Sequence, residues 1–352
     1  MSVEGIGASV FWRIRQNLER VDSDWGEFWF SHSNTLWREC GVYEHQKLAI
    51  LQFQKQFSPE GYYGWLKEQH IGVAAYNDKN YPKLLKEIES KPIILFTKGK
   101  KKGWNQLPIS VVGTRKISAY GRVATAKIVS ELVMERASIV SGFMYGVDAE
   151  AHKATVQLGG YTVGVLGYGF DWVYPPEHKT LFEQIIAFGG SFVTEYAPFV
   201  SPNKGTFVAR NRIVAGMSRG TVVIEAGIKS GSHITVEFAL DYDRSVFAVP
   251  GPITNPYSEG TKWLIKQGAI LASSGKDILD ELNVSTQEKV YPKQTPNDPF
   301  QLQLFSQLQG MSQTADSLAA TLKEPVARVQ SALSEMELEG YVGKTGASWT
   351  VR

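Results

Sequence analysis

The middle of the chain alternates short β-branched runs with helical stretches. Seven runs follow one another at about 25 to 30 residues, the spacing of repeated βα units. They are PIILF (92–96), ISVV (109–112), SIVS (138–141), TVGVL (162–166), SFVTE (191–195), TVVIE (221–225) and SVFAV (245–249). The pattern predicts an α/β fold built on a doubly wound parallel sheet.

In such a sheet, ligands bind outside the carboxyl ends of the strands, so we expect a site in the loops that follow the runs. These loops read GTRKISAYG (113–121), SGFMYGVD (141–148), GYGFDWVYPP (167–176), EAGIKSGSHIT (225–235) and PGPITNP (250–256). In four of them a glycine is followed closely by a helix start. That arrangement lets backbone N–H groups approach a phosphate.

The flanks differ in composition from the middle. At 352 residues the chain is too long for one ordinary core. Residues 1–80 hold five of the nine Trp and show the apolar spacing of a small helical (SAM-like) domain. They carry 8 basic and 10 acidic residues, so we do not expect this domain to grip phosphate. Residues 81–283 hold the βα units and form the predicted Rossmann-like domain.

The end of the chain predicts a linker and a further domain. Residues 284–298 are polar and punctuated by proline, which is typical of a linker. Residues 299–352 give three helical stretches and then two short strands around Gly346, the order of a winged helix. They carry 4 basic and 5 acidic residues, so we expect protein contact or structural capping here rather than reading of a DNA groove.

Positive charge gathers in two windows without acidic residues, although the net charge is only +2. Nine Lys or Arg lie between Glu89 and Glu131, and four lie between Glu195 and Glu225. Because both windows flank strand-to-helix loops, we expect the positive potential to lie on one part of the fold and to bind a polyanion.

Cysteine usage and the N-terminus indicate the compartment. The single Cys40 excludes a disulfide framework and a thiolate metal cluster, which fits a reducing compartment. The N-terminal stretch has no basic region followed by an apolar one, and no segment approaches membrane-spanning length. We therefore expect a cytoplasmic protein without a membrane partner.

Conventional catalytic motifs are missing from the sequence. Gly167 and Gly169 begin a dinucleotide fingerprint, but Trp172 stands at the third glycine position and two prolines follow. There is no GxxxxGK[ST] loop, no histidine pair at metal-ligand spacing and no GxSxG elbow. We expect binding without catalysis, and neither a cofactor nor a metal.

Residues suited to phosphates and bases remain. Arg115 directly follows a strand and its glycine turn, where a guanidinium can bridge phosphate oxygens. Lys204 and Phe207 open a helix and put a cation beside an aromatic face on which a base can stack. The candidate loop residues are Gly113, Thr114, Arg115 and Lys116, and the hydroxyl-rich start of another helix supplies Ser230, Gly231, Ser232 and Thr235.

Two further arginines lie on the helix that Lys204 opens. Arg210 and Arg212 are about 200° apart on it at 3.6 residues per turn, so they cannot both face one ligand. We expect one to reach the polyanion and the other to pair with an interior acid such as Glu225. Asp148 is expected to cap the helix that begins near Ala149.

Six segments in order resemble the family of the DNA-processing protein DprA, also called Smf. They are YPKLLKEIESKPIILFTKG (81–99), ISVVGTRKISAYG (109–121), IVSGFMYGVDAEAH (139–152), GGYTVGVLGYGFDWVYPPEH (159–178), FVARNRIVAGMSRGTVVIEAGIKSGSHIT (207–235) and VFAVPG (246–251). The resemblance covers the whole predicted middle domain, and the flanking domains fit the family's longer members. It implies an extended Rossmann-like fold and a cytosolic bacterial homodimer that binds single-stranded DNA, protects incoming DNA and helps load RecA in natural transformation.

The resemblance also implies a DNA pocket. It maps onto the residues Arg115, Lys204, Phe207, Arg210 and Asn211, with glycine-rich turns near Gly142 and at Ser230 to Ser232. The chain departs from the family's usual pattern at Met144 and Tyr145, where Ala-Arg is usual, so one phosphate-facing cation is missing and Tyr145 is expected to stack instead. His233 replaces the usual Leu of an SGSLIT motif.

A self-association surface follows from the same resemblance. The segment GTKWLIKQGAIL (260–271) is more apolar than a terminal helix and strand need. In the family this region dimerises and lies near the RecA contact. The residues expected there are Trp263, Leu264, Ile265, Ile270 and Leu271.

Two other functions stay open. A phosphoribohydrolase that releases bases from nucleoside monophosphates uses a related sheet, and the pattern Ser230-Gly231-Ser232-x-x-Thr235-x-Glu237 faintly resembles its PGGxGTxxE loop without the Pro-Gly-Gly. A protein scaffold with incidental basic windows is the other possibility. Salt-dependent binding of single strands separates both from the main hypothesis.

Overall fold

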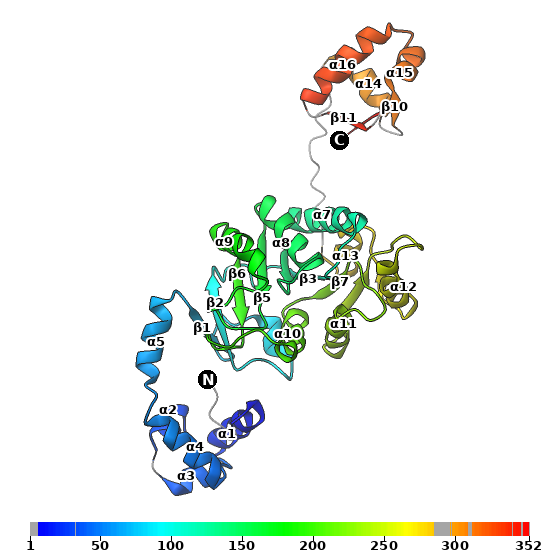
Figure 1. The fold of residues 1–352 in the computed structure, drawn as a ribbon. Helices are drawn as coiled ribbons and strands as arrows, with labels where there is room; N and C mark the ends of the chain where they lie inside the picture. The colour runs from blue at the N-terminus through cyan, green and yellow to red at the C-terminus, as the bar shows by residue number, and fades with distance from the viewer. Residues whose placement is uncertain are drawn as a thin grey trace. The chain divides into compact units, whose positions relative to one another are not determined.

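A computed structural model describes residues 6–31, 33–284, 296, 298–308, 312–339, 341–345 and 348–351. The chain divides into two compact units, Met1–Ser285 and Thr286–Arg352 (Figure 1). The linker predicted at 284–298 falls almost entirely outside the described residues.

Five helices open the first unit. They are α1 (Ala8–Arg20), α2 (Trp25–Phe30), α3 (Asn34–Glu39), α4 (Glu44–Gln54) and α5 (Pro59–Glu68). Asp24, Ser33 and Ser58 cap α2, α3 and α5 by accepting hydrogen bonds from N–H groups of the first turn. The helices enclose a small core around the buried Trp37 and Cys40. The helical character predicted for the N-terminal segment is confirmed.

A nine-stranded sheet forms the body of this unit, in the order β1-β2-β6-β5-β4-β3-β7-β8-β9. The strands are β1 (Gly72–Ala75), β2 (Ile94–Gly99), β3 (Pro108–Val112), β4 (Ser138–Ser141), β5 (Tyr161–Val165), β6 (Ser191–Thr194), β7 (Gly220–Val223), β8 (Ser245–Ala248) and β9 (Ile270–Leu271). From β6 to β9 every neighbouring pair is parallel, with Ile109 of β3 between Ile139 of β4 and Gly220 of β7. The predicted doubly wound parallel sheet is confirmed.

One end of the sheet departs from the all-parallel expectation. β1 is antiparallel to β2, and β2 is antiparallel to β6. Residues 100–107 join β2 to β3, which is too short for the crossover of a dozen or more residues that a parallel return needs. β3 therefore begins at the same end of the sheet at which β2 stops, so the two strands run in opposite directions. Because β1 lies within residues 1–80, we propose that the helical domain ends before Gly72.

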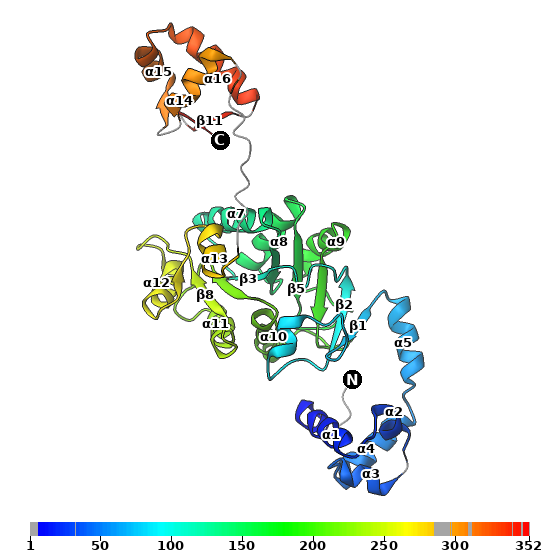
Figure 2. The same cartoon turned by 180° about the vertical axis from the view of Figure 1, so that it is seen from behind.

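Helices cover both faces of the sheet (Figures 1 and 2). They are α6 (Lys83–Glu87), α7 (Ala119–Met134), α8 (Val147–Gln157), α9 (Lys179–Ala187), α10 (Lys204–Gly216), α11 (Ser232–Asp241), α12 (Glu259–Lys266) and α13 (Gly275–Glu281). Ile128 of α7 and Ala151 of α8 pack against β3 and β4 on one face. Ile213 of α10 and Val236 of α11 pack on the other face. This three-layer core fixes the loops at both edges of the sheet.

The first basic window does not lie on one part of the fold. Lys98 belongs to β2, and the N–H of Lys100 donates to the carbonyl of Gly190, just before β6 begins. These lysines lie at the amino ends of the parallel strands. Arg115 follows the carboxyl end of β3, at the opposite edge. The expected single basic surface is therefore wrong for this window, because the antiparallel β2 turns its lysines away from the loops after β3.

The second unit contains α14 (Pro299–Leu308), α15 (Ala315–Leu322) and α16 (Val326–Leu338). A small antiparallel sheet has the order β10-β12-β11. Its strand β10 (Gln313–Thr314) lies between α14 and α15, and β11 (Val342–Thr345) and β12 (Ser348–Val351) follow α16. Leu304, Leu318 and Leu333 of the three helices meet Trp349 in one buried core. The predicted winged-helix architecture is confirmed.

Candidate nucleic-acid interface

The loops after β3, β4, β5, β6 and β7 share one edge of the sheet, because these strands are parallel. β3 and β7 are neighbours, and the sheet grows outward from them in both directions. This is the switch point of a doubly wound sheet, where ligands bind in such folds. The predicted DNA-binding residues fall on these loops or on the helices that follow them.

The loop after β3 is a tight turn that presents two cations. A Cβ on Gly113 would lie 2.6 Å from Cγ2 of Val147 and 2.7 Å from the carbonyl oxygen of Glu225, so only glycine fits. Thr114 is buried, and its N–H donates to that same oxygen at 2.7 Å. Its hydroxyl accepts the N–H of Lys116 at 3.1 Å. Arg115 and Lys116 themselves remain exposed on the turn.

Glu225 closes the N-terminus of α7 from inside the protein. Its buried carboxylate accepts hydrogen bonds from the N–H and the hydroxyl of Ser118 at 2.9 and 2.5 Å, and from the amide of Asn255 at 2.9 Å. The expectation that Glu225 pairs with Arg210 or Arg212 is therefore wrong. Since an internal acid occupies the helix N-terminus, this end of α7 is not open to a phosphate.

Arg210 is only 3 % exposed and holds the turn after β4 in place. Its Nη1 donates to the carbonyl oxygens of Gly142 and Val165, and its Nε donates to the side-chain oxygen of Asn211 at 3.2 Å. A Cβ on Gly142 would lie 2.7 Å from the guanidinium carbon and 2.6 Å from the carboxylate of Asp148. Arg210 thus points into the protein and holds the turn after β4 from its buried side.

Asp148 belongs to the same buried group and is not a helix cap. Gly146 is the N-cap of α8, and Asp148 lies within the first turn. Its carboxylate accepts the N–H of Met144 at 3.3 Å. Burial raises the pKa of Asp148 above its ordinary value, although the positive charge of Arg210 opposes the shift.

Arg212 is also engaged within the protein. Its Nη2 lies 2.6 Å from Oε2 of Glu195, and both side chains are mostly buried. One arginine of this helix was expected to face the polyanion, but Arg210 and Arg212 are both committed to interior partners. The reason is the loop after β6, which brings Glu195 to the flank of α10.

The first turn of α10 is the clearest place for an anion beside a base. Asn203 caps the helix by accepting the N–H of Thr206 at 3.0 Å, and the side chain of Lys204 is exposed. The N–H groups of the first turn that precede Thr206 have no acceptor within the helix. The ring of Phe207 lies 6.3 Å from Tyr168 and 5.5 Å from Tyr174, and it is half-buried. A cation, helix N–H groups and an aromatic face therefore occur within one turn.

The start of α11 is less open than the sequence suggests. The hydroxyls of Ser230 and Ser232 are 2.9 Å apart and bond to each other, and Ser232 and Thr235 are buried. Gly231 is exposed and serves as the N-cap residue. The side chain of His233 bonds to the carbonyl of Gly227 at 3.1 Å. Backbone groups around Gly231 are therefore better placed for an anion than the Ser232 and Thr235 hydroxyls.

Tyr145 lies exposed on the turn after β4, where a stacking residue was expected. Its hydroxyl donates to Glu177 at 2.7 Å, and its ring meets the ring of His178 edge-on at 5.3 Å. These two contacts fix the ring without covering it.

Sequence patterns did not single out three exposed aromatic side chains on the loops after β5 and β6. Trp172 and Tyr174 follow β5, and Phe199 follows β6. A period-two spacing of aromatic residues, Tyr168-x-Phe170-x-Trp172-x-Tyr174, is the signal that could have found the first two.

The residues predicted for self-association lie at the far end of the sheet. Trp263 and Leu271 are exposed, on α12 and on the edge strand β9. Ile265 and Ile270 are half-buried, and Leu264 is buried in the core. Leu264 is therefore wrong as an interface residue, because its position on α12 turns it toward the sheet.

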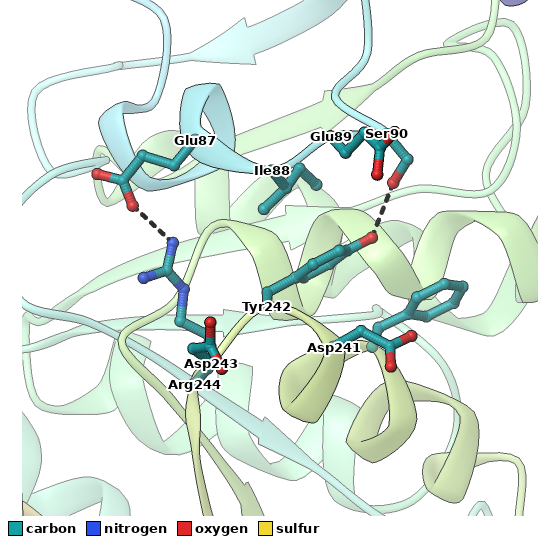
Figure 3. Close-up of a pocket in the computed structure, with 9 residues that line it drawn as sticks. Glu87, Ile88, Glu89, Ser90, Asp241, Tyr242, Asp243 and Arg244 are labelled. Atoms are coloured by element: carbon teal, nitrogen blue, oxygen red, sulfur yellow. Dashed lines mark hydrogen bonds and ion pairs between the residues drawn. The ribbon is translucent and has the colours of Figure 1, made fainter.

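A cavity of about 940 Å³ lies away from these loops (Figure 3). It is next to Arg244, which directly precedes β8 and so lies at the amino edge of the sheet. Arg244 pairs with Glu87 at 2.8 Å, and Ser90 bonds to Tyr242 at 2.8 Å. The other charged lining residues are Glu89, Asp241 and Asp243, so the cavity is acidic and unsuited to a nucleic acid.

Metal-binding clusters and membrane-spanning helices were both sought in the described residues. Among the described residues, no three His, Cys, Asp or Glu side chains are grouped so that they could hold a metal ion. None of the helices in the described part of the chain is both long enough and apolar enough to cross a membrane.

Comparison with known proteins identifies the family. The family model for DNA recombination-mediator protein A matches residues 72–283, and the DprA winged helix domain model matches residues 288–346. Protein Smf of Escherichia coli is 33% identical over 314 residues, which are 87% of this chain and 83% of that protein. DNA processing protein DprA of Streptococcus pneumoniae is 42% identical over 204 residues, which are 58% of this chain and 72% of that protein.

Solved structures agree with the sequence comparison. The crystal structure of DNA processing protein A from Streptococcus pneumoniae has a TM-score of 0.68 at 33% identity and covers 79% of this chain and 94% of its own. The Helicobacter pylori protein, described for its single-stranded DNA binding mode, has a TM-score of 0.54 at 28% identity and covers 60% of this chain and 95% of its own. The chain therefore belongs to the DprA/Smf family of DNA recombination mediators.

Proposed function

We propose that this chain binds single-stranded DNA at the loops after β3, β4, β5 and β6 and delivers it to RecA. The observation that carries the proposal is the first turn of α10, where the exposed Lys204 and the half-buried Phe207 are three residues apart and so lie on the same side of the helix. Arg115 and Lys116 add two exposed cations on the turn after β3, at the same edge of the sheet. Phosphates and unpaired bases can be held together by such a set.

The same set favours a single strand over a duplex. Phe207 can stack only on a base whose face is free, and a duplex hides these faces. The cations contact phosphates, which carry no sequence information. We therefore expect little sequence preference and an affinity that falls with salt. The single-stranded DNA binding described for the Helicobacter pylori relative supports this assignment.

We further propose a cytoplasmic homodimer that protects incoming DNA and loads RecA, as in natural transformation. The exposed Leu271 lies on the edge strand β9, which can pair with a second copy, and the exposed Trp263 lies on α12. The RecA contact is proposed beside this surface. The winged-helix unit carries Glu335, Glu337 and Glu339 at the end of α16, and we propose a protein partner for it rather than DNA.

We propose binding without turnover. The phosphoribohydrolase alternative needs Thr235 and Glu237 on one ligand, yet Thr235 is buried and Glu237 is exposed. The two residues are about 200° apart on α11 at 3.6 residues per turn. Two further acids beside the site, Asp148 and Glu225, are buried and accept hydrogen bonds from Met144 and Ser118.

A binding titration with matched variants tests the site. Lys204→Ala and Arg115→Ala should each weaken single-stranded DNA binding about tenfold while the melting temperature is unchanged. Lys102→Ala is the control, because Lys102 is exposed at the opposite edge of the sheet. Unaltered binding by both site variants, or equal losses in the control, would contradict the assigned surface.

A further inference from the structure

We infer that the DNA track continues beyond Phe207 onto a platform of three exposed aromatic side chains, Trp172, Tyr174 and Phe199. This inference rests on the proposed function and extends it, since it adds a second base-binding subsite of defined position. The occupant is a run of unpaired nucleobases that extends from the first turn of α10.

The platform is built on two loops that pack against each other. The N–H of Gly169 donates to the carbonyl of Val200 at 2.8 Å, and the N–H of Asp171 donates to that of Pro198 at 2.9 Å. A Cβ on Gly169 would lie 2.0 Å from the carbonyl oxygen of Ala197, so only glycine permits this approach. The loops after β5 and β6 therefore form one rigid surface that leads directly into α10.

Hydrogen bonds hold the ring of Trp172 and the backbone that carries Tyr174 and Phe199. The indole N–H of Trp172 donates to the carbonyl of Phe199 at 3.3 Å. The hydroxyl of Tyr168 donates to the carbonyl of Tyr174 at 2.6 Å and accepts its N–H at 3.0 Å. Rings that are fixed before binding lose little conformational entropy when a base stacks on them.

Three large rings are exposed on these two packed loops. Trp172 is 45 % exposed, Tyr174 is 36 % exposed and Phe199 is 59 % exposed. Tyr168 and Phe170, the alternate residues of the first loop, are buried. The Tyr174 ring lies 5.5 Å from that of Phe207 at an interplanar angle of 37°, so the platform continues from the proposed pocket.

The charge on these loops selects bases rather than phosphates. Residues 167–178 and 196–203 contain no Lys or Arg, and Asp171 and Glu177 are exposed among them. The Nζ of Lys98 lies 5.5 Å from the centre of the buried Phe170 ring and interacts with Asp171, so one cation from β2 borders these loops. The exposed acids repel phosphates, whereas neutral bases are not repelled. A strand can meet this charge pattern by turning its bases to the platform while Lys204 holds phosphates at the helix start.

A length series separates the platform from the pocket. Fluorescence anisotropy would measure the binding of oligothymidylates from about 4 to about 20 nucleotides, the size range over which single-strand sites operate. In the wild type, affinity should rise as the strand reaches the platform. Trp172→Ala/Phe199→Ala should remove that rise, a loss of about tenfold for each lost stack, and should leave the shortest oligonucleotides bound as before.

Salt dependence and a matched control complete the test. The platform variant should keep the wild-type slope of affinity against salt, whereas Lys204→Ala should lower the slope by about 0.7. Phe188→Ala is the control, since Phe188 is exposed just after α9 at the opposite edge of the sheet. A platform variant that binds all lengths like the wild type would overturn this inference alone. Failure of the wild type to bind any single strand would overturn the proposed function itself.

Discussion

The buried carboxylate of Glu225 accepts hydrogen bonds from both the N–H and the hydroxyl of Ser118, at 2.9 and 2.5 Å. In a doubly wound sheet, the helix after the first parallel strand is a usual place for a bound phosphate. Here a fixed internal acid fills that place. We propose that the anion site lies instead at α10, on the other face of the sheet, whose first turn carries Lys204 and no acid.

The Glu225 arrangement predicts a large effect from a small change. Glu225→Gln should lower the free energy of unfolding by about 2 kcal/mol, because the new amide group would face a donor in a buried site. Ser118→Ala should cost about 1 kcal/mol through loss of the α7 cap. Urea titrations measure both, with the exposed Glu237→Gln as the control. A Glu225→Gln variant as stable as the wild type would show that this contact is not structural.

The buried Arg210 and Asp148 predict a rescue. Arg210→Ala should destabilise the fold by about 3–5 kcal/mol, because it leaves the carboxylate of Asp148 buried without its cation. Asp148→Asn in that background should recover part of the loss.

The pH dependence of the Arg210→Ala variant follows from the raised pKa of Asp148. A carboxyl whose pKa is raised on folding contributes stability below its unfolded pKa, and this stability is lost as pH rises through the folded pKa. The variant should therefore be closest to the wild type in acid and furthest from it at neutral pH. If Arg210→Ala loses as much stability relative to the wild type in acid as at neutral pH, this account of Arg210 and Asp148 is contradicted.

His152 predicts a loss of stability in mild acid. Burial, with repulsion from His178 and Arg210, lowers the pKa of His152 to about 3, and its Nδ1 lies 2.7 Å from the hydroxyl of Thr162. A histidine with a lowered folded pKa contributes stability above its unfolded pKa of about 6.5, and this is lost as pH falls toward the folded value. From about pH 7 to about pH 5 the loss should be about 2 kcal/mol.

His152→Gln tests that window directly. The variant should lose about 2 kcal/mol less than the wild type between the two pH values, because glutamine does not titrate. His45→Gln, which changes an exposed histidine, should follow the wild-type curve. Identical pH profiles for His152→Gln and the wild type would refute the role of burial.

The exposed end of the sheet predicts the oligomeric state. The wild type should be a dimer by light scattering at micromolar concentration, and Trp263→Ala/Leu271→Glu should be a folded monomer, because both apolar side chains are exposed, Leu271 on the edge strand β9 and Trp263 on α12. Phe188→Ala should remain a dimer. A wild-type monomer would refute the proposed surface.

Local patterns predicted most of the fold. Each β-branched run became one of the strands β2 to β8, because buried parallel strands read as short continuous apolar runs. The edge strand β1 escaped notice, since Gly72–Ala75 contains only one β-branched residue. The terminal helix and strand expected in 260–271 correspond to α12 and β9. The antiparallel β2 was not predictable from composition, because its direction depends on the length of the connection to β3.

The site was predicted in part. The position of each residue between a strand and the next helix was enough to place Arg115 on an exposed loop and Lys204 at an exposed helix start. Both lie at the carboxyl ends of the parallel strands. The partners of Arg210 and Arg212 could not be predicted, because Val165 and Glu195 are brought to α10 by loops far along the sequence. Helical spacing shows that the side chains of Arg210 and Arg212 point in different directions. Their hydrogen-bond partners depend on how the rest of the protein packs around α10.

The most direct test of the central claim compares single-stranded and duplex DNA of the same sequence. The wild-type protein should bind the single strand at least tenfold more tightly than the duplex, and the affinity should fall steeply as salt is raised. Excess nucleoside monophosphate should not compete, and no free base should be released. Equal affinity for the two DNA forms, or catalytic release of base that is abolished in Glu237→Ala, would contradict the account.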